Sequence, residues 1–320
     1  MYSEILETTI TLEQIKIAIL VPCYNVENYL PYLFEGIHAQ SILFDEIICY
    51  DDCSQDNSAE IAQSLGAKVI KGITNKGAAF ARNRLIEATT CNWVHFHDAD
   101  DLIDSSFVEE FKHSIQNSLN TQSNCYLSNM DVKRGIHKEI QSTVVYNSEE
   151  IEKDAIKYFL ENNGFALIGC YPIDLLKKIG GFREDIRGNE DPDLHIRLAA
   201  VGAHFICLNK ALVTNITRED SFSVQNWLHC MKDKLTCLEH YHLVLNPKYF
   251  EIIGEQAAKL SNYFYKENEV DLSNKALNLA LRTKVRTIKG TLFSEYISKL
   301  FGVAFYIWLS RRRIDYNLSK

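Results

Sequence analysis

The chain has 320 residues, of which 46% are hydrophobic and 24% are charged, a composition typical of a globular protein with a sizeable core. Its formal net charge of -8 argues against nonspecific binding to nucleic acid. The nine cysteines are scattered without a CxxC pair, which favours neither a disulfide framework nor a zinc knuckle and indicates a reducing cytosol. The N-terminal stretch MYSEILETTITLEQ carries acids and no apolar run, so a usual secretory signal is excluded and we expect a cytoplasmic protein.

The first hundred residues alternate between strand patterns and helix patterns. Apart from Lys16, the run IKIAILVP at 15–22 is apolar and ends at a proline, as expected of a strand buried on both faces. Further strands follow in alternation with helices, which predicts a doubly wound, mostly parallel α/β sheet with helices on both faces. We expect strands at 15–22, 45–52, 67–72 and 92–97, and helices at 26–39, 56–65 and 77–90.

The later part of the chain changes character. A helix is expected at 148–163, a second helix from about Asp193, and a strand at 204–208. Beyond about residue 222 the pattern is all helical and increasingly basic. The sequence therefore predicts an α/β domain over 1–222 and a helical C-terminal region over 223–320.

Acidic side chains gather where two of the expected strands end. Asp51 and Asp52 follow the second strand, and Asp98, Asp100 and Asp101 follow the fourth. In open α/β sheets, ligands bind outside the carboxyl ends of the strands. Carboxylates this close repel one another, so the clusters indicate that a cationic ligand is expected there.

Five motifs in a fixed order give the chain a family resemblance. It resembles the family 2 glycosyltransferases, the inverting group built on the GT-A nucleotide-sugar-binding fold, over about its first 215 residues. One such motif would be weak support, whereas five in order are specific. The motifs are VPCYNVENYL (21–30), DEIICYDDCSQDNS (45–58), NKGAAFARNRLIEAT (75–89), HFHDADDLI (95–103) and GGFREDIRGNEDPDLHIRLAAVGA (180–203).

The resemblance implies transfer of a sugar from a nucleotide-diphosphate donor, expected to be a UDP-sugar, to an acceptor hydroxyl. A divalent cation would neutralise the charge that the leaving diphosphate gains. By the family pattern Asp98 and Asp100 form the DxD element that binds Mg²⁺ or Mn²⁺, with Asp100 the direct ligand and Asp101 supporting the metal or the sugar. Acids after a strand can instead cap the next helix, but residues 104–106 already offer such caps.

The nucleotide site implied by the resemblance draws on four segments. A carboxylate after the second strand can accept a hydrogen bond from uracil N3-H or a ribose hydroxyl, and Asp52 is the position expected to contact the base. Ser54 and Asp56 are instead expected to form a polar turn. Cys53 stands where the family usually has glycine, which leaves the backbone of that loop and the base preference open. Gly77 would permit close backbone approach. The expected nucleotide-binding residues are Pro22, Tyr24, Asp51, Asp52, Asp98 and Arg82, whose guanidinium could reach the diphosphate.

The stretch GNEDPDLHIRL predicts the catalytic residue. Asp191 before Pro192 has the pattern of a helix N-cap with proline at the first helical position. The family uses the aspartate of this pair as the general base that deprotonates the acceptor hydroxyl, with inversion at the anomeric carbon. Asp191 is therefore expected to be the base, and Glu190 to assist acceptor binding.

Two further features are weaker. His95 and His97 face the same side of a strand and could join a carboxylate in a transition-metal site, but packed, hydrogen-bonded histidines are favoured. Arg218 and Ser221 lie where related chains have a loop that closes over the diphosphate.

The C-terminal tail is strongly basic. From Lys275 onward ten basic residues stand against two acids, and cationic residues alternate with apolar ones up to a three-arginine cluster. Its longest uncharged apolar run, 300–310, is too short for a bilayer span, which needs about 20 residues. The tail could contact an anionic membrane surface through its arginines and through Phe301, Phe305 and Trp308, or these aromatics could pack on the protein.

Three other functions compete with the transferase. A haloacid dehalogenase-type phosphatase needs its aspartate pair after the first strand with a threonine or valine two residues on, where this chain has Leu102. A sugar nucleotidyltransferase needs a glycine-rich signature that VPCYNVEN lacks. A catalytically inactive nucleotide-sugar-binding module stays open, and Asp100 with Asp191 is the feature against it. The sequence identifies neither the sugar nor the acceptor, which could be a saccharide, lipid-linked or protein-linked.

Overall fold

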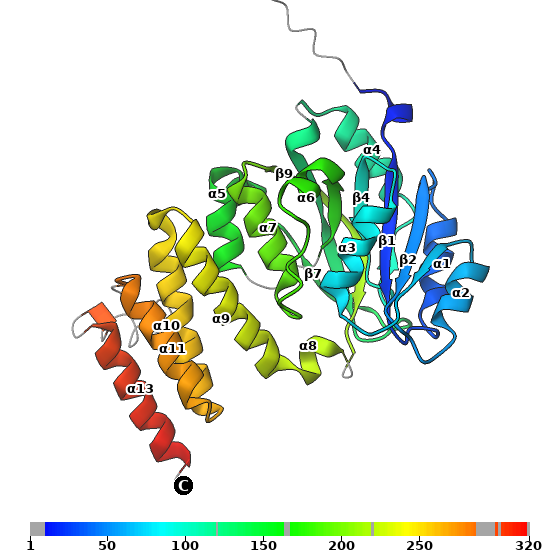
Figure 1. The fold of residues 1–320 in the computed structure, drawn as a ribbon. Helices are drawn as coiled ribbons and strands as arrows, with labels where there is room; N and C mark the ends of the chain where they lie inside the picture. Colours follow the sequence, from blue (N-terminus) through cyan, green and yellow to red (C-terminus); the bar gives the residue numbers. More distant parts are fainter. Residues whose placement is uncertain are drawn as a thin grey trace, which may run out of the picture. The chain divides into compact units, whose positions relative to one another are not determined.

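The computed structural model describes residues 10–119, 121–162, 167–218, 221–285, 298–299 and 302–318. The chain divides into two compact units (Figure 1). Unit 1 consists of Met1–Tyr158 and Gly164–Ser221, and unit 2 of Phe159–Asn163 and Phe222–Lys320.

Unit 1 is built on a mixed sheet. The described strands run in the order β3-β2-β1-β4-β8-β6-β9-β5, with β7 paired to β6. The first four strands of this order are parallel, and antiparallel pairs appear from β8 onward. The strands are β1 (Ile17–Cys23), β2 (Glu46–Asp51), β3 (Lys68–Lys71), β4 (Trp93–Phe96), β5 (Leu102–Ile103), β6 (Asn124–Lys133), β7 (Ile140–Val144), β8 (Gly169–Pro172) and β9 (His204–Ile216).

The parallel half of the sheet matches the predicted strands. β1 lies between β2 and β4, and Ile17, Ile19 and Leu20 are fully buried, as the continuous apolar run requires. Pro22 costs no ladder hydrogen bond on the β4 side, because that pairing ends at Leu20. The predicted doubly wound α/β fold with a helical C-terminal part is confirmed.

The other half contains strands that the periodicity analysis missed. β6 pairs parallel with β9 and antiparallel with β7 and β8, so the sheet is more mixed than predicted. β6 carries buried polar side chains, among them Asn124, Ser128 and Asn129, and it therefore lacks the apolar pattern of a core strand. Their hydrogen bonds are satisfied: Asn124 donates to the Leu119 carbonyl at 2.8 Å.

The helices of unit 1 pack along the sheet. α3 packs against β1 and β2, and α4 against β6 and β9. The helix expected at 148–163 ends slightly earlier and has non-helical backbone at Asp154. These helices are α1 (Leu30–His38), α2 (Ser58–Ser64), α3 (Ala78–Ala88), α4 (Phe107–Gln116), α5 (Ser148–Glu161), α6 (Ile173–Lys178) and α7 (Glu190–Ala200), with the last residues of α5 belonging to unit 2.

Unit 2 is helical in its described part. α10 and α11 pack closely because small side chains face each other: the Ser261 hydroxyl donates to the Ser273 carbonyl at 2.9 Å, and the Ser273 hydroxyl to the Ser261 carbonyl at 2.7 Å. Within the described ranges no helix combines the length and apolarity needed to cross a membrane. The helices are α8 (Phe222–Gln225), α9 (Trp227–Val244), α10 (Phe250–Lys266), α11 (Val270–Arg282) and α13 (Val303–Leu318).

Candidate active site

The acidic residues singled out in the sequence lie at one edge of the sheet in unit 1. β1, β2 and β4 are parallel neighbours, so the segments after Cys23, Asp51 and Phe96 leave the sheet at the same edge. The order β2-β1-β4 places a topological switch point beside β1, where open α/β sheets bind ligands. Tyr24, directly after β1, is 47% exposed at this edge.

Asp52 fastens the start of α3 to the end of β2. Its carboxylate accepts the backbone N-H of Lys76 at 3.0 Å and of Gly77 at 2.6 Å, and the side chain is buried. These are N-H groups at a helix N-terminus, which a negative charge stabilises. Gly77 has a φ of 90°, which a residue with a side chain adopts only at a cost. Asp52 therefore positions the α3 loop in this structure.

Asp51 has a different environment. It is the last residue of β2, it is buried, and its Oδ1 has no hydrogen-bond partner among the described residues. A buried carboxylate oxygen without a donor is costly. Asp51 is thus the aspartate of this pair whose carboxylate lacks a donor at one oxygen.

The loop after Asp52 is held by the turn after β1. The Ser54 hydroxyl accepts the Asn25 backbone N-H at 3.0 Å, and the Asn25 side chain accepts the Gln55 backbone N-H at 2.8 Å. Asp56 accepts the backbone N-H groups of Glu27 and Ser58. The expectation that Ser54 and Asp56 form a polar turn is confirmed.

Cys53 adopts the conformation for which glycine is the usual choice. Its φ of 67° is left-handed, so the loop keeps the backbone that a glycine there would have. Replacing Cys53 by glycine is expected to raise the free energy of unfolding by about 1 kcal/mol over the Cys53→Ala control, because a side chain in this region costs about 1–2 kcal/mol. Urea denaturation of both variants measures the difference, and equal midpoints would show that the left-handed backbone carries no strain.

Arg82 is the centre of the site. The α3 side chain is only 3% exposed, and its guanidinium makes ion pairs with three carboxylates. Nη2 donates to Asp98 Oδ1 at 2.8 Å, while Nη1 donates to Glu190 Oε1 at 3.1 Å and to Asp191 Oδ1 at 3.0 Å. Residues 98–101, called the DADD segment below, and the start of α7 are therefore joined through one buried cation. The Arg82 guanidinium, which was expected to bind the diphosphate, is paired in this structure with carboxylates of the protein itself.

Burial tunes the acids around Arg82. It raises the pKa of Asp191 to about 8, although the charge of Arg82 opposes this rise. Burial likewise raises the pKa of Glu190, and Arg82 again opposes it. Burial lowers the pKa of Arg82, but the charges of Asp191, Asp98 and Glu190 raise it by more. The pKa therefore lies above its ordinary value, and the guanidinium stays charged. A carboxylate poised near neutral pH is suited to proton transfer.

The start of α7 differs from the prediction. Asp191 is not the N-cap: the helix begins at Glu190, and the cap residue is Asn189, whose φ of 67° is left-handed. The N-cap assignment is wrong because asparagine tolerates this conformation and proline is accepted throughout the first turn, not only at its first position. Asp191 is held by Arg82 instead of by a capping bond.

The remaining two acids of the DADD segment have separate partners. Asp100 Oδ2 forms an ion pair with Arg218 Nη2 at 2.6 Å. Asp101 is buried and accepts the Asn215 side-chain amide at 3.0 and 3.1 Å and the Ile216 backbone N-H at 2.9 Å. Burial raises the pKa of both carboxyls, and the charge of Asp98 adds to the rise. Asp101 ties the segment to β9.

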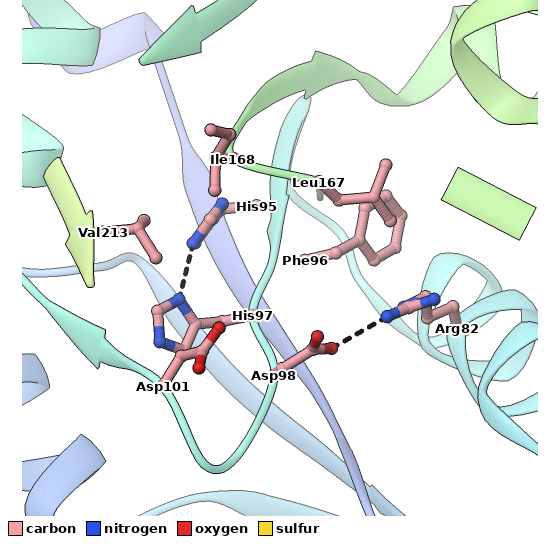
Figure 2. Close-up of a pocket in the computed structure, with 9 residues that line it drawn as sticks. All are labelled: Arg82, His95, Phe96, His97, Asp98, Asp101, Leu167, Ile168 and Val213. Atoms are coloured by element: carbon pink, nitrogen blue, oxygen red, sulfur yellow. Dashed lines mark hydrogen bonds and ion pairs between the residues drawn. The ribbon is translucent and has the colours of Figure 1, made fainter. Parts of the chain in front are cut away.

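His95 and His97 form a buried chain beside this segment (Figure 2). The Gly169 carbonyl can only accept, so His95 Nδ1 carries a proton and donates to it at 2.9 Å. His95 Nε2 then accepts from His97 Nδ1 at 2.9 Å. Burial lowers the pKa of both rings, that of His97 to about 4. The described residues contain no group of three or more His, Cys, Asp or Glu side chains arranged to hold a metal, and the interpretation as packed, hydrogen-bonded histidines agrees with these contacts.

Asn83 is a supporting residue that the sequence did not reveal. Its side chain donates to the Phe182 carbonyl at 2.9 Å and accepts the Phe182 N-H at 2.7 Å. A Cβ at Gly181 would come within 2.3 Å of the Asn83 Oδ1 atom, so the approach requires glycine. The GGF segment before α7 is thereby clamped to the helix that carries Arg82. The two glycines of this segment are the only feature of the sequence that could have indicated this close approach.

A family model and relatives match this chain. The model described as Glycosyl transferase family 2 matches residues 18–174. Glycosyltransferase GlyA of Streptococcus pneumoniae is 28% identical over 253 residues, 73% of this chain and 35% of that protein. The amylovoran biosynthesis glycosyltransferase AmsB of Erwinia amylovora is 26% identical over 317 residues, 86% of this chain and 99% of that protein. The match thus spans about a third of GlyA and 61% of an uncharacterized Haemophilus influenzae glycosyltransferase.

Solved structures share the fold. S. aureus TarS 1-349 in complex with UDP-GlcNAc superposes with a TM-score of 0.57 at 18% identity, covering 84% of this chain and 90% of that one. The mannosyltransferase PcManGT from Pyrobaculum calidifontis in complex with GDP-Man and Mn2+ gives 0.54 at 13% identity, covering 94% and 87%. The predicted GT-A-type fold is confirmed.

Proposed function

Because the chain belongs to glycosyltransferase family 2, we propose that it is an inverting, metal-dependent enzyme that moves a sugar from a UDP-sugar to an acceptor hydroxyl. One observation carries the proposal: the buried Arg82 guanidinium contacts both Asp191, the proposed base, and Asp98 of the DADD segment. The acid that would deprotonate the acceptor and the acid that would face the donor are thus fixed relative to each other. We place the product in polysaccharide or glycoconjugate synthesis, as the name of AmsB suggests.

The donor nucleotide would lie at the ends of β1 and β2. The unpartnered Asp51 Oδ1 would accept a hydrogen bond from uracil N3-H or a ribose hydroxyl, and the exposed Tyr24 ring would contact the base beside Pro22. Asp52 would act by holding Gly77 and the start of α3 in place. TarS was solved with UDP and UDP-GlcNAc, and PcManGT with GDP-Man.

The acids present fit a divalent cation that is shared with the donor. Asp98 and Asp100 offer hard oxygen ligands, and Mg²⁺ commonly takes one or two carboxylates plus substrate phosphates. Asp98 and Asp100 would hold Mg²⁺ or Mn²⁺, which when bound would neutralise charge on the departing diphosphate. Asp101 would hold the segment through β9.

Asp191 would remove the proton of the acceptor hydroxyl as its oxygen attacks the anomeric carbon. Its carboxylate is fixed by Arg82 Nη1, and its pKa of about 8, raised by burial, makes it a stronger base than an exposed aspartate. Glu190, on the same nitrogen, would help bind the acceptor. Attack on the face opposite the leaving diphosphate inverts the anomeric centre without an enzyme nucleophile.

Nucleotide binding tests the donor assignment. Isothermal titration of the full chain with UDP, GDP and dTDP, each with Mn²⁺ or Mg²⁺, is expected to give the tightest binding for UDP with a metal. Tighter binding of GDP would overturn the uridine assignment, and binding of none of them would overturn the proposed function.

We also propose that α13 contacts the inner face of an anionic membrane in a cytoplasmic protein. Val303 and Ile307 are buried, whereas Phe305 and Trp308 are 40% and 51% exposed and stack at 5.6 Å. Arg312 lies over the Trp308 ring at 5.5 Å. Exposed aromatics beside arginines suit a headgroup interface. Phe301, also part of this expectation, lies outside the described residues.

Replacing Phe305 and Trp308 together by serine is expected to lower flotation with phosphatidylglycerol-containing liposomes by at least about tenfold, because burying each ring contributes about 1.5–3 kcal/mol. Leu243→Ser is the matched control, since Leu243 is 81% exposed in unit 2 but belongs to α9. Flotation that is absent in the natural chain, or unchanged by the double replacement, would contradict the membrane contact.

A further inference from the structure

The second aspartate of the proposed metal pair already has a cation beside it. Arg218 Nη2 lies 2.6 Å from Asp100 Oδ2, and the two side chains are 22% and 21% exposed. The guanidinium also lies over the Tyr29 ring at 4.5 Å, a favourable cation-π arrangement. Arg218 follows β9 by two residues, so it approaches Asp100 from a segment distant in sequence.

This ion pair differs from the one at the first aspartate. Arg82 is nearly inaccessible and holds Asp98, Glu190 and Asp191 at once, so removing it from Asp98 would disturb the whole site. The Arg218 pair is partly exposed, and within the DADD segment it involves Asp100. A pair of this kind can be exchanged for another partner at lower cost.

Building on the proposed metal-dependent transfer, we propose that Arg218 is the resident counter-ion of Asp100, which the divalent cation has to displace. A guanidinium and a divalent cation on one carboxylate repel each other strongly at such short range. The donor diphosphate offers the displaced guanidinium a new bidentate partner. Cation and nucleotide should therefore bind cooperatively, each raising the affinity for the other by the same factor.

Calorimetric titration of the full chain with Mn²⁺, with and without UDP, tests this coupling. For the natural chain, UDP is expected to strengthen Mn²⁺ binding by about tenfold or more, within the usual range of coupling between sites. Arg218→Met should bind Mn²⁺ alone about tenfold or more tightly than the natural chain, and UDP should add less. Lys210→Met is the matched control, because Lys210 is on β9, the strand that precedes Arg218, but pairs with Glu110. It should leave Mn²⁺ binding unchanged.

These titrations distinguish a failure of the counter-ion proposal from a failure of the proposed function. If both proteins bind Mn²⁺ with UDP but Arg218→Met gains no affinity for Mn²⁺ alone, the counter-ion proposal is wrong and the proposed function stands. If neither binds Mn²⁺ under any condition, the metal-dependent function fails and the proposal with it. Should Arg218→Met not fold, Tyr29→Leu removes the ring beneath the guanidinium and should raise the affinity for Mn²⁺ a few fold; no change there would overturn the proposal.

Discussion

Replacing Asp191 by asparagine is expected to lower kcat by about 10³-fold or more, at the upper part of what a general base contributes. The affinity for the donor nucleotide should change little, because the variant keeps the Oδ1 atom that accepts from Arg82 Nη1. Nucleoside diphosphate release at saturating donor and acceptor gives kcat, and calorimetry gives the nucleotide affinity. Glu190→Gln is the control on the same nitrogen of Arg82 and should act mainly on the KM for the acceptor.

The pH profile adds a readout that a structural role of Asp191 would not move. Burial raises the pKa of Asp191 to about 8, and only the deprotonated form can act as base. With limiting donor, kcat/KM should therefore rise with pH, about tenfold per unit, up to the pKa of the free enzyme and level off above it. Asp191→Asn should lose this ascending limb. A variant with more than a tenth of the natural rate and an unchanged profile would exclude Asp191 as the base.

Replacing Arg82 by methionine is expected to lower the free energy of unfolding by about 3–5 kcal/mol, because it leaves three partly buried carboxylates without their buried cation. Asp98, Glu190 and Asp191 all lose the same partner. Chemical denaturation measures the loss. Arg84→Met is the matched control on α3: its pair with Glu87 is largely exposed, and about 0.5 kcal/mol is expected.

The loss should depend on pH in a defined direction. Without Arg82 the pKa of Asp191 rises above about 8, far from its ordinary value of 3.8. Below about pH 8 both folded chains hold this proton, which the unfolded chain has released, so both lose stability equally as pH rises. Above pH 8 the natural Asp191 has lost its proton while the variant still holds it, so the difference from the natural chain should be larger at pH 9.5 than at pH 7. Equal losses in Arg82→Met and Arg84→Met would show that Arg82 is no more than a surface charge.

The sequence predicted the parallel strands and their acidic ends well, because those segments carry local signals. A run such as Ile17–Cys23 is apolar throughout, Asp51 ends β2, and Asp98 lies two residues after β4. The edge at which these acids meet then follows from parallel topology alone. Cys53 shows the limit of residue identity: its side chain differs from glycine, yet its backbone takes the conformation glycine favours.

What the sequence could not predict depends on contacts between distant segments. Arg82 and Asp191 are separated by 109 positions, and Asp101 and Asn215 by 114. Neither pair leaves a periodic pattern. β6 was missed because several of its buried residues are polar, so it lacks the apolar pattern of a core strand. Hydrogen bonds to other residues of the fold satisfy these polar side chains. The N-cap prediction at Asp191 was wrong for a local reason, since the helix already begins at Glu190, directly after Asn189 in a left-handed conformation.

Metal-dependent transferase activity is tested most directly by the release of nucleoside diphosphate from a panel of UDP-, GDP- and dTDP-sugars. The purified chain with Mn²⁺ or Mg²⁺ is compared with Asp100→Ala. We expect slow, metal-dependent release from one UDP-sugar, which Asp100→Ala should lose. Nucleotide binding without release from any donor, even when candidate acceptors are added, would contradict this expectation and identify a nucleotide-sugar-binding module without catalysis.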